Sequence, residues 1–298
     1  MSPKSDFEYP WEIKTEVERL QKQYAWIQRC IDNKIIFAPV PLHQEGLKVL
    51  DVGCADVRDL KKQVSPSARL VGVDVLEAFL PSSEEGLRYE TYDLCEPPRQ
   101  ELIGVFDVTH VRFVIPGAAK VGYQKAVEHL ACTLAPGGWL QVHEMDFDLQ
   151  DKPNIGPALK EVCALFSGVF KAMGMVSDLV KKLPEAFETV GLDHVNAETI
   201  ELPMGKLLGD DEAAEMSLQP FLLTIPSLIQ GAKGLGADVP ESVFDGLAAR
   251  FEKEVREQGA VFFTKVVTGR KPAQLQTAGD FRNDLKDEET DASDHRLP

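Results

Sequence analysis

Residues 49–60 read VLDVGCADVRDL, an apolar run that ends in a carboxylate and a glycine and continues into a polar stretch. Such a run is typical of a buried parallel strand that leads through a tight turn into a helix. Gly53 permits the turn, because glycine adopts positive φ angles without steric cost. The segment predicts the first strand–turn–helix unit of an open α/β sheet, although on its own it could equally be an ordinary βα turn.

Segments of the same type recur along the chain and alternate with helical patterns. Further strands are predicted at RLVGVDV (69–75), VFDVTHVRFV (105–114), GGWLQVHEMDF (138–148), HVNAETIEL (194–202) and AVFFTKVVTGRKP (260–272), and a third candidate strand precedes Asp93. Helices are predicted at 123–138, 156–173, 178–190, 212–232 (with two prolines inside) and 242–258. In the first of these helices Ala126, Leu130 and Leu134 share one face. The alternation predicts βαβ units and a doubly wound, mostly parallel sheet.

The two ends of the chain differ from this pattern. Residues 15–31 form a helical pattern whose apolar stripe consists of Val17, Leu20, Tyr24, Ile27 and Ile31. Residues 273–298 contain seven acidic and three basic residues and few large apolar ones, a composition typical of a disordered tail. We therefore expect an N-terminal helical cap (1–46), a single domain (47–272) and a disordered acidic tail (273–298).

Composition narrows the classes of partner. Thirty-two basic and 48 acidic side chains give a formal net charge of −16, which disfavours binding to nucleic acid or to an anionic membrane. No stretch approaches the roughly 18 apolar residues of a membrane span. The five cysteines show no CxxC spacing, which predicts neither a metal site nor a disulfide framework. We expect a cytoplasmic protein with reduced thiols that acts on a small molecule; the sequence does not give its oligomeric state.

Carboxylates follow the first three predicted strands in register. Asp51 ends the first strand, and Asp74 ends the second, 21 residues after Gly53. A carboxylate at that place accepts hydrogen bonds from a ribose diol in doubly wound folds, and Asp93 after the third strand could reach an adenine amine. A pyrophosphate-binding G-x-G-x-x-G loop is disfavoured, because Ala55 and Arg58 stand where its second and third glycines would be.

Five segments resemble, in their order along the chain, the motifs of class I S-adenosylmethionine (SAM)-dependent methyltransferases. They are D-x-G at position 51, V-D at 73–74, the Asp93 turn, FDVTHVRF (106–113) and LAPGGWLQVHE (134–144). More narrowly, the chain resembles the fungal LaeA-like methyltransferases of secondary metabolism over about residues 7–272. That similarity rests on E-x-x-R-L-x-x-Q-Y (16–24), FAPV (37–40), GVD with FLP (79–81), H-x-R-F (110–113), PGGW (136–139) and GRKP (269–272). Ala55 and Val57 depart from the family's glycines; SAM carries no pyrophosphate, so its site can tolerate them.

The resemblance implies a seven-stranded sheet of order 3-2-1-4-5-7-6 with the last strand antiparallel, and SAM bound across the carboxyl ends of the first strands. It implies cofactor binding by Asp51, Gly53, Asp74, Val75, Asp93, Leu94 and Arg112. The N-terminal helix and a lid insertion (207–232) would cover the site, unless the apolar stripe of the insertion is plain core. The implied activity is methyl transfer to a hydroxyl or amine of a small molecule, in particular a secondary metabolite. A regulator acting through protein partners, or a SAM-binding fold with another activity or none, is the alternative.

Methyl transfer needs alignment above all, and a base only where the nucleophile must lose a proton. The candidate bases are His143, which strand alternation places on one face with Gln141, and His110 one strand over. Either histidine could instead be bonded into the framework. Arg112 could hold the methionine carboxylate of SAM, orient the substrate or pair with Glu144.

Overall fold

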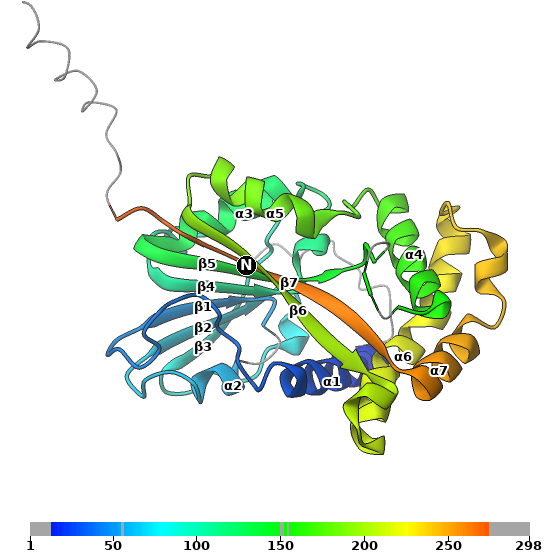
Figure 1. Ribbon diagram of the computed structural model, residues 1–298. Coiled ribbons are helices and arrows are strands. Elements are labelled where there is room, and N and C mark those ends of the chain that lie inside the picture. Colours follow the sequence, from blue (N-terminus) through cyan, green and yellow to red (C-terminus); the bar gives the residue numbers. More distant parts are fainter. Residues whose placement is uncertain (1–12, 55–56, 150–151, 154, 274–298) are drawn as a thin grey trace, which may run out of the picture.

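The computed structural model describes residues 13–54, 57–149, 152–153 and 155–273. The described chain forms a seven-stranded sheet of order β3-β2-β1-β4-β5-β7-β6 (Figure 1). Strand β7 is antiparallel to both of its neighbours, and the other pairings are parallel. The predicted doubly wound α/β sheet and its strand order are therefore confirmed. The predicted tail beyond residue 273 lies outside the described residues, as does Ala55.

Every predicted strand is present. The strands are β1 (Lys48–Val52), β2 (Arg69–Asp74), β3 (Leu87–Thr91), β4 (Phe106–Arg112), β5 (Leu134–Asp146), β6 (Asp193–Met204) and β7 (Ala260–Arg270). The start of β5 differs from the prediction, which placed Leu134 on the preceding helix. Leu134 has extended backbone angles and pairs with Phe106, because the helix ends at Thr133. Leu134 matches the helical spacing only because α3 and β5 are both buried where they join, so an apolar residue is needed on either side of the junction.

The helices largely follow the prediction. They are α1 (Ile13–Cys30), α2 (Arg58–Lys61), α3 (Tyr123–Thr133), α4 (Pro157–Ala172), α5 (Leu179–Thr189), α6 (Asp211–Leu235) and α7 (Leu247–Gln258), with 3₁₀ helices η1 (Glu77–Phe79), η2 (Gln100–Leu102), η3 (Ile115–Ala118), η4 (Gly205–Leu208) and η5 (Glu241–Phe244). Segment 242–258 is divided between η5 and α7, because Gly246 adopts a φ of 59°. Helix α6 runs through Pro220 and Pro226, since buried packing compensates for the two missing N–H donors.

The two faces of the sheet are covered by different segments. Leu50 and Val142 share one apolar cluster with α3 and α5. On the opposite face, Val49 and Val108 share another cluster with residues 35–38 and α2. Because neighbouring residues of a strand point to opposite faces, this division follows from the alternation within each strand. The segment after α1 is therefore part of the core on this face of the sheet.

A helical layer lies beyond the carboxyl end of β5. Asp146 at that end pairs with Phe263, which lies near the start of β7, and helix α7 directly precedes β7 in the chain. Helices α1, α4, α6 and α7 bury one common apolar cluster around the far ends of β6 and β7, and Figure 1 shows α4, α6 and α7 gathered there. Ligands of open α/β sheets bind at the carboxyl ends of the strands. The helical layer therefore borders the expected site. No helix in the described ranges is long and apolar enough to cross a membrane.

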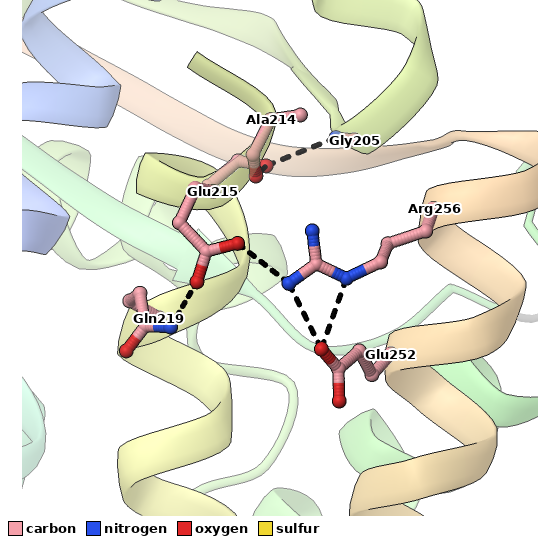
Figure 2. A network of polar contacts seen from close by, with 7 residues as sticks. Gly205, Ala214, Glu215, Gln219, Glu252 and Arg256 are labelled. Atoms are coloured by element: carbon pink, nitrogen blue, oxygen red, sulfur yellow. Dashed lines mark hydrogen bonds and ion pairs between the residues drawn. The ribbon is translucent and has the colours of Figure 1, made fainter. Parts of the chain in front are cut away.

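Polar contacts fix the first half of α6 within this layer (Figure 2). Arg256 of α7 donates to Glu215 of α6 at 2.5 Å and to Glu252 at 2.8 Å, and Gln219 donates to the other oxygen of Glu215. The buried Ser217 hydroxyl accepts from the Gly205 N–H at 2.9 Å. Helix α6 is thus joined to both α7 and the end of β6.

Candidate functional site

The three strand-end carboxylates lie at one edge of the sheet. Asp51 is one residue from the end of β1, Asp74 ends β2, and Asp93 follows β3 by two residues. These strands are adjacent and parallel, and Asp74 pairs with Thr91 at the end of β3. The structure therefore brings together the acids that the sequence placed in register.

Gly53 makes the turn after β1. Its φ is 69°, and its N–H donates to the Val73 carbonyl oxygen at 2.8 Å. A Cβ atom at this position would lie 2.2 Å from Val114 Cγ2, so no side chain fits there. Both backbone conformation and close approach thus require glycine. The turn is held between β2 and the segment after β4.

Asp74 and Asp93 are each fixed by a short turn. Asp74 Oδ1 accepts from the Leu76 N–H at 3.1 Å, and Asp93 Oδ1 accepts from the Cys95 N–H at 2.9 Å. This side-chain-to-backbone bond two residues on fixes the direction of a carboxylate. Val75 is half-buried and Leu94 is buried within the same two turns. Both turns are thus preorganised at the edge where the sequence predicted a ligand.

His110 lies beside Asp51 on neighbouring strands. The two residues are paired in register, and His110 Nδ1 is 2.8 Å from Asp51 Oδ1. His110 is fully buried, and its Nε2 has no hydrogen-bond partner among the residues that the structure describes. If the ionised carboxylate accepts the Nδ1 hydrogen, Nε2 of the neutral ring presents a lone pair.

Arg112 ends β4 and reaches helix α1. Its guanidinium lies 4.7 Å from the centroid of the Tyr24 ring, and the Tyr24 hydroxyl donates to Asp59 Oδ2 at 2.7 Å. Burial, together with the hydrogen bond to Asp59, raises the pKa of Tyr24, so the phenol remains a donor. The sequence placed Tyr24 in an apolar stripe and in the E-x-x-R-L-x-x-Q-Y motif, but gave it no role in the site. The one hydroxyl in that stripe was the signal that could have identified it.

His143 is enclosed on the same face of the sheet. Its Nε2 lies 2.7 Å from Thr264 Oγ1 of β7, and its ring packs against Phe113 and Phe37 at centroid distances of 5.0 and 6.2 Å. Burial, followed by the charges of Arg112 and His110, lowers the pKa of His143 well below 6.5. The ring is therefore neutral at physiological pH.

Glu144 points away from His143 and holds the segment after β4. Its Oε1 accepts from the backbone N–H groups of Val114 and Ile115, both at 2.9 Å, so its partners are these amides and not Arg112. Burial raises the pKa of Glu144 to about 8 against the lowering effect of the amides. The preceding Phe113 has a φ of 59°, a strained conformation for a bulky side chain. The segment that packs on Gly53 is thus strained and held by a buried carboxyl.

Gln141 joins the sheet to the segment after α1. Its Oε1 accepts from the N–H groups of Phe37 and Ala38 at 2.6 and 3.0 Å, and its Nε2 donates to the Ile35 carbonyl oxygen at 2.8 Å. The sequence placed Gln141 on the face of His143 but gave it no role. This amide holds the FAPV segment, and with it Phe37, against the site.

The chain is similar in sequence to several fungal methyltransferases. No family model matches the chain. N-methyltransferase tcpN of Claviceps purpurea is 27% identical over 266 residues, which cover 87% of this chain and 95% of that protein. Methyltransferase str3 of Strobilurus tenacellus is 30% identical over 203 residues, 63% of this chain and 68% of that protein. The secondary metabolism regulator laeA of Coprinopsis cinerea is 32% identical over 110 residues, 35% of this chain and 26% of that protein.

Proposed function

Because the chain belongs to the class I SAM-dependent methyltransferases, in the group of fungal methyltransferases of secondary metabolism, we propose that it methylates a nitrogen atom of a small molecule. Its cofactor is SAM, and its substrate is a small molecule with a hydroxyl or amine. The choice of nitrogen is the proposal. The observation that carries it is the enclosed, neutral His143 at the carboxyl end of β5.

The residues present fit SAM. Gly53 makes the tight turn after β1 with a φ of 69°, and the buried Nε2 of His110 has no hydrogen-bond partner among the residues that the structure describes. We propose that the cofactor is held by the residues that the sequence singled out: Asp51, Gly53, Asp74, Val75, Asp93, Leu94 and Arg112. Bound there, SAM supplies a methyl group activated by the sulfonium.

The side chains near the ends of β4 and β5 are suited to alignment rather than to deprotonation. A hydroxyl must lose its proton on methylation, whereas a neutral amine attacks through its lone pair. His143 is a poor match for removing a hydroxyl proton, because burial lowers its pKa and makes it a weak base, and its Nε2 already lies 2.7 Å from Thr264 Oγ1. The oxygen of Glu144 that faces the backbone already accepts two N–H groups. Alignment alone can lower the barrier by roughly 7–11 kcal/mol. The earlier prediction of His143 or His110 as a general base stays a prediction.

The atom that is methylated can be determined directly. Metabolites that accumulate when the gene is deleted are incubated with the purified protein and SAM carrying an isotope-labelled methyl group. Mass spectrometry then identifies the labelled product, and the NMR shift of the labelled carbon distinguishes a methyl on nitrogen from one on oxygen. We expect label on nitrogen. Label on a hydroxyl oxygen would show that the proposal is wrong and would restore the need for a base.

We further propose that residues 1–46 act as a cap and 207–232 as a lid over the domain 47–272, with 273–298 as a dispensable acidic tail. The burial of Phe221 and Ile225 of α6 beside α1 and α4 supports a lid that is also core. The net charge of −16 supports a small-molecule partner rather than nucleic acid, and the five free cysteines support a cytoplasmic location. A regulatory role is the weaker alternative, because the similarity to laeA spans only 26% of that protein.

A further inference from the structure

Two buried side-chain nitrogen atoms have no hydrogen-bond partner among the described residues. They are Nε2 of Gln28 on α1 and Nε2 of His110 on β4. Gln28 is 5% exposed and His110 1% exposed, so water does not reach either group freely. Buried polar atoms are nearly always paired, and an exception indicates strain, function or a missing ligand.

Both nitrogens belong to residues that flank the same contact. His110 precedes Arg112 by two residues and therefore shares its face of β4. Gln28 lies one helical turn after Tyr24 and shares its face of α1. The Tyr24 ring lies against the Arg112 guanidinium at 4.7 Å. The residues that carry the two unpaired nitrogens therefore lie next to the two members of this contact, Gln28 beside Tyr24 on α1 and His110 beside Arg112 on β4.

The charges around this contact are complementary to a zwitterion. Arg112 forms no ion pair with a carboxylate in the described part of the chain, and Asp59, the acid that faces it, is engaged by Tyr24 and Lys62 at 2.7 and 2.6 Å. Arg112 and the Gln28 amide thus offer a cation and an N–H donor. On the sheet, the Asp51 carboxylate and the His110 lone pair offer acceptors. A ligand with a carboxylate and an ammonium close together would pair with both sets of groups, the carboxylate with Arg112 and Gln28 and the ammonium with His110 and Asp51.

We propose that Gln28 and Arg112 bind the α-carboxylate of SAM, and that His110, oriented by Asp51, accepts a hydrogen bond from its α-ammonium group. This assignment rests on the proposed SAM-dependent function but does not depend on which atom is methylated. It gives α1 a direct part in cofactor binding. It also makes His110 a binding residue whose ring nitrogen is used by the cofactor and not by the substrate.

Ligands with and without an amino-acid end test the proposal. Isothermal titration calorimetry is performed with SAM, S-adenosylhomocysteine and methylthioadenosine, which lacks the amino-acid end. Gln28→Leu should weaken the binding of SAM and S-adenosylhomocysteine by about tenfold or more, as expected for a lost charge-assisted hydrogen bond. It should weaken the binding of methylthioadenosine by less than about threefold. Asp74→Ala should weaken the binding of all three ligands. Gln21→Leu, at an exposed position of the same helix, should change none.

The stability of the ligand-free protein gives a second readout. Gln28→Leu removes a buried amide nitrogen that has no partner among the described residues, so the melting temperature should stay the same or rise, whereas replacement of a glutamine with a structural role would lower it. Equal weakening of all three ligands, or unchanged SAM affinity, would overturn the proposal. Failure of the wild-type protein to bind SAM would instead overturn the cofactor assignment itself, so the two failures are distinguishable.

Discussion

Replacement of Glu144 by glutamine should change how stability depends on pH. Burial raises the pKa of this carboxyl from 4.5 to about 8, although two backbone amides favour its ionised form. The folded protein therefore binds the proton more tightly than the unfolded chain. The resulting stability is fully present below pH 4.5 and is lost as pH rises through 8. The Glu144→Gln variant lacks this titration.

The size of the effect follows from the shift. At 1.36 kcal/mol per pKa unit, a rise from 4.5 to about 8 corresponds to roughly 5 kcal/mol of unfolding free energy. The carboxyl is fully buried, so solvent screening does not reduce this figure.

Urea unfolding of both proteins at a series of pH values between 5 and 8.5 measures the difference. We expect the wild-type protein to lose several kcal/mol relative to Glu144→Gln across this range, with most of the loss complete at pH 8.5. The difference between the two curves removes the contributions of all other titrating groups. Parallel curves would refute the reasoning, because Glu144 would then be ionised in the folded protein at neutral pH. NMR titration of the labelled carboxyl carbon gives the pKa independently.

Three further substitutions test the site and the helical layer beside it. His143→Gln should lower kcat by less than about tenfold, because methylation of an amine does not need a positioned base, whose proton removal typically contributes 10²–10⁴-fold to the rate. A hundredfold loss of kcat, together with loss of the acidic limb of the pH–rate profile, would establish His143 as a general base. Gly53→Ala should cost roughly 1–2 kcal/mol from its positive φ alone, beyond the clash with Val114, and abolish SAM binding in calorimetry; unaltered binding would place the cofactor elsewhere. Glu254→Ala should cost about 1–3 kcal/mol in denaturant unfolding, because it leaves two buried N–H groups at the start of α4 unpaired, and an unchanged midpoint would contradict this.

Much of the fold was predictable because its determinants are local. The apolar runs at 49–52 and 69–73 have the length and composition of buried parallel strands, and glycine at position 53 sets the turn. The strand order itself came from the resemblance and not from periodicity. The error lies where two elements share one pattern, because Leu134 fits a helical stripe but begins β5. The helix predicted at 212–232 is present as α6 and contains both prolines, since packing outweighs local propensity there.

The sequence by itself determined the acidic edge of the site. In a parallel sheet, side chains at the ends of adjacent strands must lie together, so the positions of Asp51, Asp74 and Asp93 along the chain were sufficient. Only the tertiary structure decided which partners surround them. Tyr24 meets Asp59 across 35 residues, and His143 meets Thr264 across 121 residues. No spacing rule connects such positions, because contacts between separate elements depend on how those elements pack, and packing is a property of the whole chain.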